Sequence, residues 1–182
     1  MPTGSDSQGS LPEGIEGGHH RDLMGSRAYH PWARRAGLGL LLAIVVVALL
    51  NVFGQASTTS TAAGPAATLT LRGPTHLRGG LIFQERFTIQ SRREIKTPKL
   101  VLSPGWFDGI TLNEFEPSAG QEGSRNGSVA FTLESMTPGE RQVIWTEWQV
   151  NPTNVTHRAL HVDLYDGGTP LAQIGRTITV LP

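Results

Sequence analysis

Three glutamates are the residues whose type and spacing best fit hydrolysis. Glu114, Glu116 and Glu122 are close together in the sequence, and a pair of carboxylates is the catalytic machinery of most glycoside hydrolases. Acidic residues are also common in exposed loops, and no surrounding pattern fixes the distance between these three. An anchored cell-wall or polysaccharide hydrolase that uses loop carboxylates is therefore the alternative, and the main expectation is a protein without catalysis.

Two histidines form the best candidate pair for a metal ion. His157 and His161 would share one face of a strand at about 13 Å from each other, too far to bind one ion together. Asp163 and Asp166 precede a Gly-Gly turn but lack the alternating oxygen ligands of a calcium loop. The chain has no cysteine, no G-x-S-x-G or S-x-x-K motif and no phosphate-binding glycine loop. We expect neither a metal nor a cofactor.

Aromatic residues offer a different chemistry, the recognition of a partner. Trp106, Phe107 and Asp108 lie in a tight bend rich in proline and glycine, and an exposed tryptophan there could anchor an interface. Alternatively, Trp106 folds inward and caps the core. Trp145 and Trp148 lie in one strand-like segment, residues 141–150, and their odd spacing points them to opposite faces. We expect one of these two in the core and the other against a second layer or a partner.

Short strands must position these side chains. Apolar and polar residues alternate in several segments, most clearly in residues 81–90 (LIFQERFTIQ), where Glu85 alone interrupts the apolar face. Turn residues separate these segments at intervals of about ten residues, as in a β-sandwich. The expected strands are 67–71, 81–90, 99–102, 127–134, 141–150, 159–165 and 174–181. The sequence thus predicts an all-β, immunoglobulin-like sandwich of seven or eight antiparallel strands over residues 67–182, with residues 117–127 as an exposed loop.

Two sets of motifs carry a resemblance to known families. The segments MTPGERQVIW and ALHVDLYDGG, in this order before a terminal strand, resemble bacterial immunoglobulin-like modules. The segments LLNVFGQ (49–55), LVLSPGWFDG (100–109) and QVNPTNV (149–155) are similar to actinobacterial single-pass membrane proteins with an extracytoplasmic domain of this kind. The resemblance implies the fold and location, gives no activity, and adds a multi-span membrane protein as an expected partner.

One apolar run determines where the protein is located. Residues 36–54 (AGLGLLLAIVVVALLNVFG) contain no charged residue, and a helix of this length extends about 28 Å, close to the hydrocarbon thickness of a bilayer. We therefore expect a transmembrane helix at 34–55, in which Asn51 is the amide that could bond a neighbouring helix. The alternative, a buried helix of a soluble core, would normally show a polar face.

The distribution of positive charge predicts which end of this helix lies in the cytoplasm. Arg27, Arg34 and Arg35 precede the run, whereas the first cation after it is Arg72, which puts the N-terminus in the cytoplasm. Cleavage of a signal peptide after Ala56 is the competing possibility, but the apolar run and the segment before it exceed the usual lengths. Lysine plus arginine and aspartate plus glutamate number 15 each, so no basic face for nucleic acid is expected.

The sequence therefore predicts a type II single-pass membrane protein. Its parts are a disordered cytoplasmic tail (1–33), the transmembrane helix (34–55), a flexible spacer (56–66) and an extracytoplasmic β-sandwich (67–182). The expected function is binding or scaffolding, by contact with another membrane protein or a cell-envelope component. A secreted domain, released by cleavage, has the same fold at a different location.

Overall fold

The computed structural model describes residues 30–50 and 55–182, in two units that are considered separately. The first contains the helix α2 (His30–Leu49), and its large apolar side chains, among them Leu38, Ile44 and Leu49, are exposed. The part from Pro31 to Leu49 is long and apolar enough to cross a membrane, a property that signal sequences share. The helix overlaps the span predicted at 34–55, whereas Asn51 and the tail up to residue 29 lie outside the described residues.

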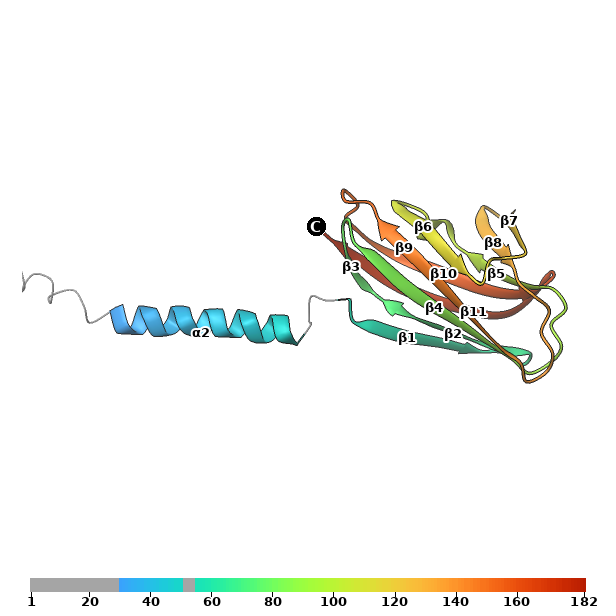
Figure 1. Cartoon of the computed structure of the whole chain (residues 1–182), viewed down its shortest axis with the longest axis horizontal. Coiled ribbons are helices and arrows are strands. Elements are labelled where there is room, and N and C mark those ends of the chain that lie inside the picture. The colour runs from blue at the N-terminus through green and yellow to red at the C-terminus, as the bar shows by residue number, and fades with distance from the viewer. Residues whose placement is uncertain (1–29, 51–54) are drawn as a thin grey trace, which may run out of the picture. The chain divides into compact units, whose positions relative to one another are not determined.

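The second unit is a sandwich of two β-sheets (Figure 1). Sheet A has the strand order β1-β2-β4-β9-β6, and sheet B has the order β3-β11-β10-β5-β8-β7. All neighbouring strands are antiparallel except β3 and β11, which are parallel. The strands are β1 (Ser57–Ala63), β2 (Ala67–Pro74), β3 (His76–Arg78), β4 (Ile82–Ser91), β5 (Pro98–Leu102), β6 (Ile110–Glu116), β7 (Gln121–Arg125), β8 (Ser128–Thr132), β9 (Arg141–Val150), β10 (Thr156–Asp166) and β11 (Thr169–Leu181), with a short 3-10 helix, η1 (Pro104–Trp106), after β5.

Seven of these strands reproduce the immunoglobulin arrangement. In sheet A, β2, β4, β9 and β6 follow the order A-B-E-D, and in sheet B, β11, β10 and β5 follow the order G-F-C. The strands β1, β3, β7 and β8 add to the outer parts of the two sheets. The prediction of an immunoglobulin-like sandwich is thus confirmed, with four more strand segments than the common framework.

Some irregular segments of the sequence prediction are strands in the structure. The expected spacer at 56–66 contains β1, which pairs with β2 along its whole length. The expected loop at 117–127 contains β7, and β6 follows the bend that includes Trp106. Both β1 (STTSTAA) and β7 (QEGSR) are mostly exposed edge strands. Such strands bury few side chains, so their sequences lack the alternation by which strands are recognised.

The core fills the space between the sheets. Alternate residues of β2, β4, β9, β10 and β11 are buried, which is the period of two that a strand imposes. Its largest fully buried side chains are Trp106, Trp148, Phe87 and Phe131. The other faces of the two sheets point away from this core, so β9 has one buried and one outward face.

Candidate binding face

Trp106 belongs to the core and is only 1% exposed. Its indole Nε1 donates a hydrogen bond to the backbone oxygen of His161 (3.1 Å), and its ring centroid lies 5.3 Å from that of Trp148. The inward alternative is therefore correct, and Trp106 is not part of a contact surface. The short helix η1 turns the chain sharply after β5 and so directs this side chain between the sheets.

The two residues after Trp106 also do not form an exposed aromatic anchor. Phe107 is partly buried and meets Trp148 edge to face, with ring centroids 5.6 Å apart. Asp108 is exposed and pairs with Arg158 of β10, with Oδ2 and Nη1 2.6 Å apart. This surface ion pair ties the bend to sheet B.

The two tryptophans of β9 point in opposite directions, as expected from their spacing. Trp148 is fully buried, and its Nε1 donates to Thr146 Oγ1 at 2.8 Å. Trp145 is 48% exposed, and the Arg86 guanidinium carbon lies 5.3 Å from its ring centroid. Of the aromatic side chains predicted to contact a partner, Trp145 is the one that the structure leaves available.

Trp145 lies on the outward side of sheet A, which we call the outer face. The pairing of the strands arranges the charged and polar residues of this face in two rows across the sheet. One row runs Arg72–Arg86–Trp145–Glu116, and the other runs Gln84–Glu147–Glu114, from β2 or β4 across β9 to β6. Directly opposed residues on neighbouring strands share a face and have Cβ atoms about 5 Å apart. The outer face is thus a continuous surface of polar and charged groups around one tryptophan.

An irregularity in β6 places the two glutamates on this face. The pairing of β6 with β9 shifts between Leu112 and Glu114, so that Asn113 has no opposite residue. In a regular strand Leu112, Glu114 and Glu116 would share one face, whereas the extra residue of a bulge turns the following side chains over. As a result Leu112 packs against the core, while Glu114 and Glu116 point outward.

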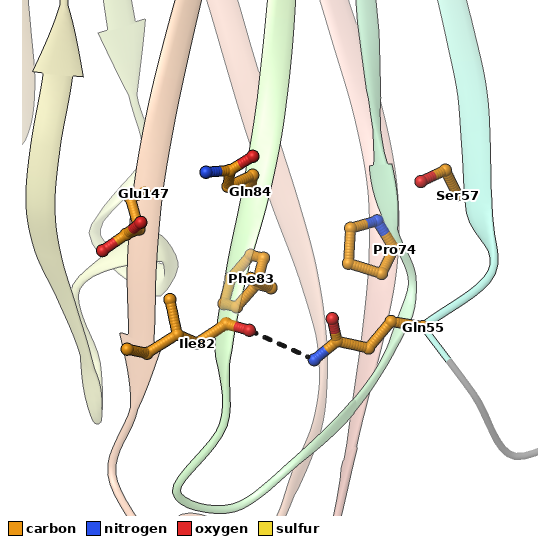
Figure 2. A pocket seen from close by; sticks show the side chains of 7 residues that line it. All are labelled: Gln55, Ser57, Pro74, Ile82, Phe83, Gln84 and Glu147. Carbon is orange, nitrogen blue, oxygen red and sulfur yellow. Dashed lines mark hydrogen bonds between the residues drawn. The ribbon is translucent and has the colours of Figure 1, made fainter.

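The outer face is hollowed along the same strands. One hollow of about 380 Å³ is lined by residues that include Ser57, Gln84 and Glu147 (Figure 2). A second, of about 320 Å³, and a third, of about 100 Å³, both include Gln84 and Trp145. Because Gln84 borders all three, they form one shallow, open depression rather than an enclosed pocket.

Around Trp145, charge on the outer face is divided between two halves, and Arg141 adds a cation on the same face at the start of β9. Arg72 and Arg86 lie on β2 and β4, whereas Glu147, Glu114 and Glu116 lie on β9 and β6. Among the described residues, none of these five side chains forms an ion pair within the chain. Glu114 and Glu147 are directly opposite each other, an arrangement of like charges that costs stability. A partner that supplies cations there would relieve this cost.

The other candidate catalytic and metal-binding residues are not brought together. Glu122 is on β7 of sheet B, so it does not join Glu114 and Glu116 on sheet A, and those two lie on a strand rather than in a loop. His157 bonds Thr179 Oγ1 through Nδ1 at 2.9 Å. In residues 30–50 and 55–182 no three His, Asp or Glu side chains could hold one metal ion.

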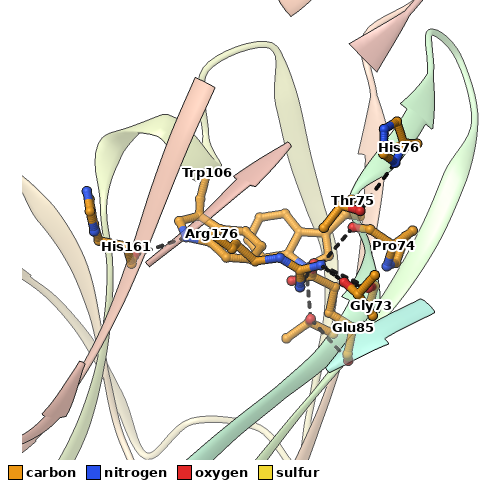
Figure 3. A network of polar contacts seen from close by, with 11 residues as sticks. Gly73, Pro74, Thr75, His76, Glu85, Trp106, His161 and Arg176 are labelled. Atoms are coloured by element: carbon orange, nitrogen blue, oxygen red, sulfur yellow. Dashed lines mark hydrogen bonds and ion pairs between the residues drawn. The ribbon is translucent and has the colours of Figure 1, made fainter. Parts of the chain in front are cut away.

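The sequence interpretation missed one polar site, which lies inside the sandwich. Glu85 of β4 and Arg176 of β11 are buried between the sheets, with Oε1 and Nη1 3.3 Å apart (Figure 3). Arg176 Nη2 also donates to the backbone oxygens of Gly73 and Pro74 and to Thr58 Oγ1, at 2.9, 3.2 and 3.0 Å. The signal for this site was the glutamate that interrupts the apolar face of residues 81–90.

Burial dominates the electrostatics of this pair. It raises the pKa of the Glu85 carboxyl from 4.5 to about 8, although attraction to Arg176 acts in the opposite direction. Burial likewise lowers the pKa of the Arg176 guanidinium. A Cβ atom at Gly73 would lie 2.6 Å from Glu85 Cγ, so only glycine leaves room for the carboxyl. Because its bonds join β1, β2, β4 and β11, the Glu85–Arg176 pair is structural.

Comparison with known proteins adds a similarity of fold. The sequence matches no protein-family model and no curated protein. Solved structures with a similar course of the chain include a CARDB domain from Pyrococcus furiosus, at 13% identity over 65% of this chain and 97% of that one, with a TM-score of 0.44. A chitin-binding domain of a chitinase from the same organism has 16% identity, 64% and 99% coverage and a TM-score of 0.35. A non-cellulosomal cohesin from Archaeoglobus fulgidus has 13% identity, 69% and 92% coverage and a TM-score of 0.37. Similarities this distant carry no argument about function.

Proposed function

We propose that this protein is a membrane-anchored binding module, held by α2, that presents the outer face of sheet A to a partner outside the cytoplasm. The partner is another membrane protein or a component of the cell envelope. The observation that carries the proposal is the half-exposed Trp145 in the middle of a hollowed face, where Arg72, Arg86, Glu114, Glu116 and Glu147 form no ion pairs among the described residues. Tryptophan and arginine are the residues most enriched at the energetic centres of interfaces.

The anchoring part of the proposal is supported by the helix. A helix that is apolar on all sides must be covered by protein or lipid, and the large apolar side chains of α2 are exposed. The arginines before the helix favour a cytoplasmic N-terminus. The alternative of cleavage after Ala56 is compatible with the fold, because β1 begins at Ser57 and would remain intact.

Crosslinking in the native membrane tests both parts. The full-length protein is crosslinked and recovered, and the intact mass of the recovered chain is measured in the same experiment. We expect a chain that retains residues 1–56 together with a specific membrane or envelope component. A chain that begins at Ser57 would instead identify a secreted domain, and a full-length chain recovered alone would count against a binding module.

Matched variants connect the partner to the outer face. Trp145→Ala should reduce recovery of the crosslinked partner by about tenfold, the size of effect expected for a residue at the centre of an interface. Val155→Ala is the control, because Val155 is also apolar and 61% exposed but lies in the loop after β9. Equal loss of the partner in both variants would show that the contact does not depend on the outer face.

A further inference from the structure

The row of residues through Trp145 is complementary to itself under a two-fold rotation. Read from β2 to β6, one row is Arg72, Arg86, Trp145 and Glu116, so each half carries groups that complement the other half. The midpoint of this row lies between β4 and β9. A two-fold axis through that midpoint, parallel to the strands, would place β2 of one copy opposite β6 of another and β4 opposite β9, with β1 beyond the paired strands.

We propose that the outer face of sheet A pairs with the outer face of a second copy about this two-fold axis. The pairing rests on the proposed function, because it names the occupant of the same face. Arg72 then lies opposite Glu116 of the second copy, and Arg86 opposite its Trp145. Gln84 lies opposite Glu147 of the second copy and can donate to that carboxylate. Every one of these contacts occurs twice, as in all isologous interfaces.

A two-fold axis that runs across the strands leaves Arg72 and Glu116 without opposite charges. Such an axis would lie between the two paired faces and run perpendicular to the strands. It would then put β2 opposite β2 of the second copy and β6 opposite its β6. Arg72 would then face the half that carries Arg72 of the second copy, and Glu116 the half that carries its Glu116. Only the axis parallel to the strands brings the Arg72 guanidinium to the Glu116 carboxylate of the second copy and the Arg86 guanidinium to its Trp145 ring.

The same axis agrees with attachment of both copies to one membrane. Rotation about an axis parallel to the strands preserves strand direction, so β1 begins at the same end in both copies. Both chains can therefore come from helices in a single bilayer. An axis across the strands would put the two starting points of β1 at opposite ends of the pair, which suits copies on facing membranes.

The size of the face makes the pairing dependent on the membrane. The four strands that overlap about this axis, spaced about 4.8 Å apart with about seven residues each, give roughly 450 Å² per copy. The total of roughly 900 Å² is below the usual size of a specific interface, so free domains would associate weakly. Anchoring in one bilayer raises the effective concentration of the second copy and favours the pair.

Cysteine crosslinking of the full-length protein in its membrane tests the pairing directly. The chain contains no cysteine, so a single introduced thiol is unique. Gln84→Cys lies beside the axis, and a bismaleimide that bridges stacked sheets, about 10 Å apart, should join two copies. Thr177→Cys is the matched control, since it is also exposed but lies on β11 of sheet B. We expect a covalent dimer from the first variant at least about tenfold more abundant than from the second.

Charge exchange provides the second measurement. On the Gln84→Cys background, Arg72→Glu and Glu116→Arg should each lower the dimer yield by roughly fivefold, because like charges then face each other. The double variant Arg72→Glu/Glu116→Arg should recover most of the yield. Both residues are exposed, so the changes leave the core intact.

The outcomes separate this inference from the proposed function. Equal crosslinking at positions 84 and 177, or single charge reversals without effect, would overturn the pairing. If position 84 captures a different membrane protein and no second copy, the pairing is wrong and the binding module stands. If position 84 captures nothing, the pairing is wrong, and the binding module is decided by the crosslinking experiment in the native membrane, which needs no thiol on the partner.

Discussion

Trp145 and Trp148 lie on the same strand in opposite environments. Trp148 is fully buried among aromatic rings and hydrogen-bonded through its indole, whereas Trp145 is half exposed and accompanied by Arg86. The inner face of sheet A also carries a buried glutamate with a cation opposite it in sheet B, while the outer face carries charges that have no partner among the described residues. The comparison indicates that the inner face maintains the fold, whereas the outer face contributes little to it and is the surface that we propose for binding.

The largest expected effect is the loss of the inner tryptophan. Trp148→Ala removes a fully buried ring that contacts Trp106 and Phe107, and should lower the free energy of unfolding by about 3–5 kcal/mol. Urea unfolding of the full-length protein in detergent, followed by far-ultraviolet circular dichroism, measures this loss. Trp148→Phe keeps most of the ring and loses the bond to Thr146, so it should cost less. A cost below about 1 kcal/mol for Trp148→Ala would contradict its assignment to the core.

The buried ion pair should give the next largest effect. Arg176→Met leaves the Glu85 carboxyl buried without its cation and removes the bonds to Gly73 and Pro74, so at pH 9 we expect a loss of about 3 kcal/mol in the free energy of unfolding. At pH 5 the carboxyl is neutral and the loss should be smaller. Because apolar residues can replace a buried pair at little cost, Glu85→Leu/Arg176→Met should regain much of the stability. If the loss is the same at both pH values, Glu85 is not the group left uncompensated.

The unsubstituted protein should itself become less stable as the pH rises. The folded-state pKa of Glu85, about 8, lies above the unfolded value of 4.5, so the folded domain retains a proton that the unfolded chain releases. The stabilisation is complete below pH 4.5 and is lost as the pH rises to about 8, by at most about 1.4 kcal/mol per pH unit for this group. Urea unfolding at several pH values measures the slope. Glu85→Gln cannot titrate and should remove this contribution. An unchanged slope in that variant would assign the effect to other groups.

The comparison of faces also shows how much of this molecule could be predicted from its sequence. The opposite orientation of Trp145 and Trp148 follows from the period of two, and so do the buried alternate residues of 81–90. The composition of the outer face could not be predicted in the same way. Glu114 and Glu116 lie on the outer face because Asn113 is an extra residue in β6, and no local sequence pattern predicts that bulge. The row Arg72–Arg86–Trp145–Glu116 depends on the register of four strands, which forms only in the folded sheet.

The buried Glu85–Arg176 pair could also be predicted only in part from the sequence. Glu85 interrupts an apolar face, which is visible in the sequence, but its partner Arg176 is 91 residues away in the other sheet. A strand pattern shows that a charge points inward and does not show which cation is opposite. Burial of a charged carboxyl without a partner would have been the more costly arrangement, so an inward-pointing glutamate in such a strand indicates either a buried cation or a carboxyl that remains protonated.

The smallest expected effect on stability is that of replacing Trp145. This variant tests the difference between the two faces of β9 at a single side chain. Trp145→Ala removes a ring that packs against Arg86 and otherwise faces solvent, so the free energy of unfolding should change by no more than about 0.5 kcal/mol. The same urea titration as for Trp148→Ala measures it, in the same protein and on the same strand. A stable variant that no longer crosslinks to its partner would separate binding from folding at the level of one side chain. If Trp145→Ala instead destabilised the domain by several kcal/mol, the outer face would have a structural role, and any loss of binding would reflect unfolding.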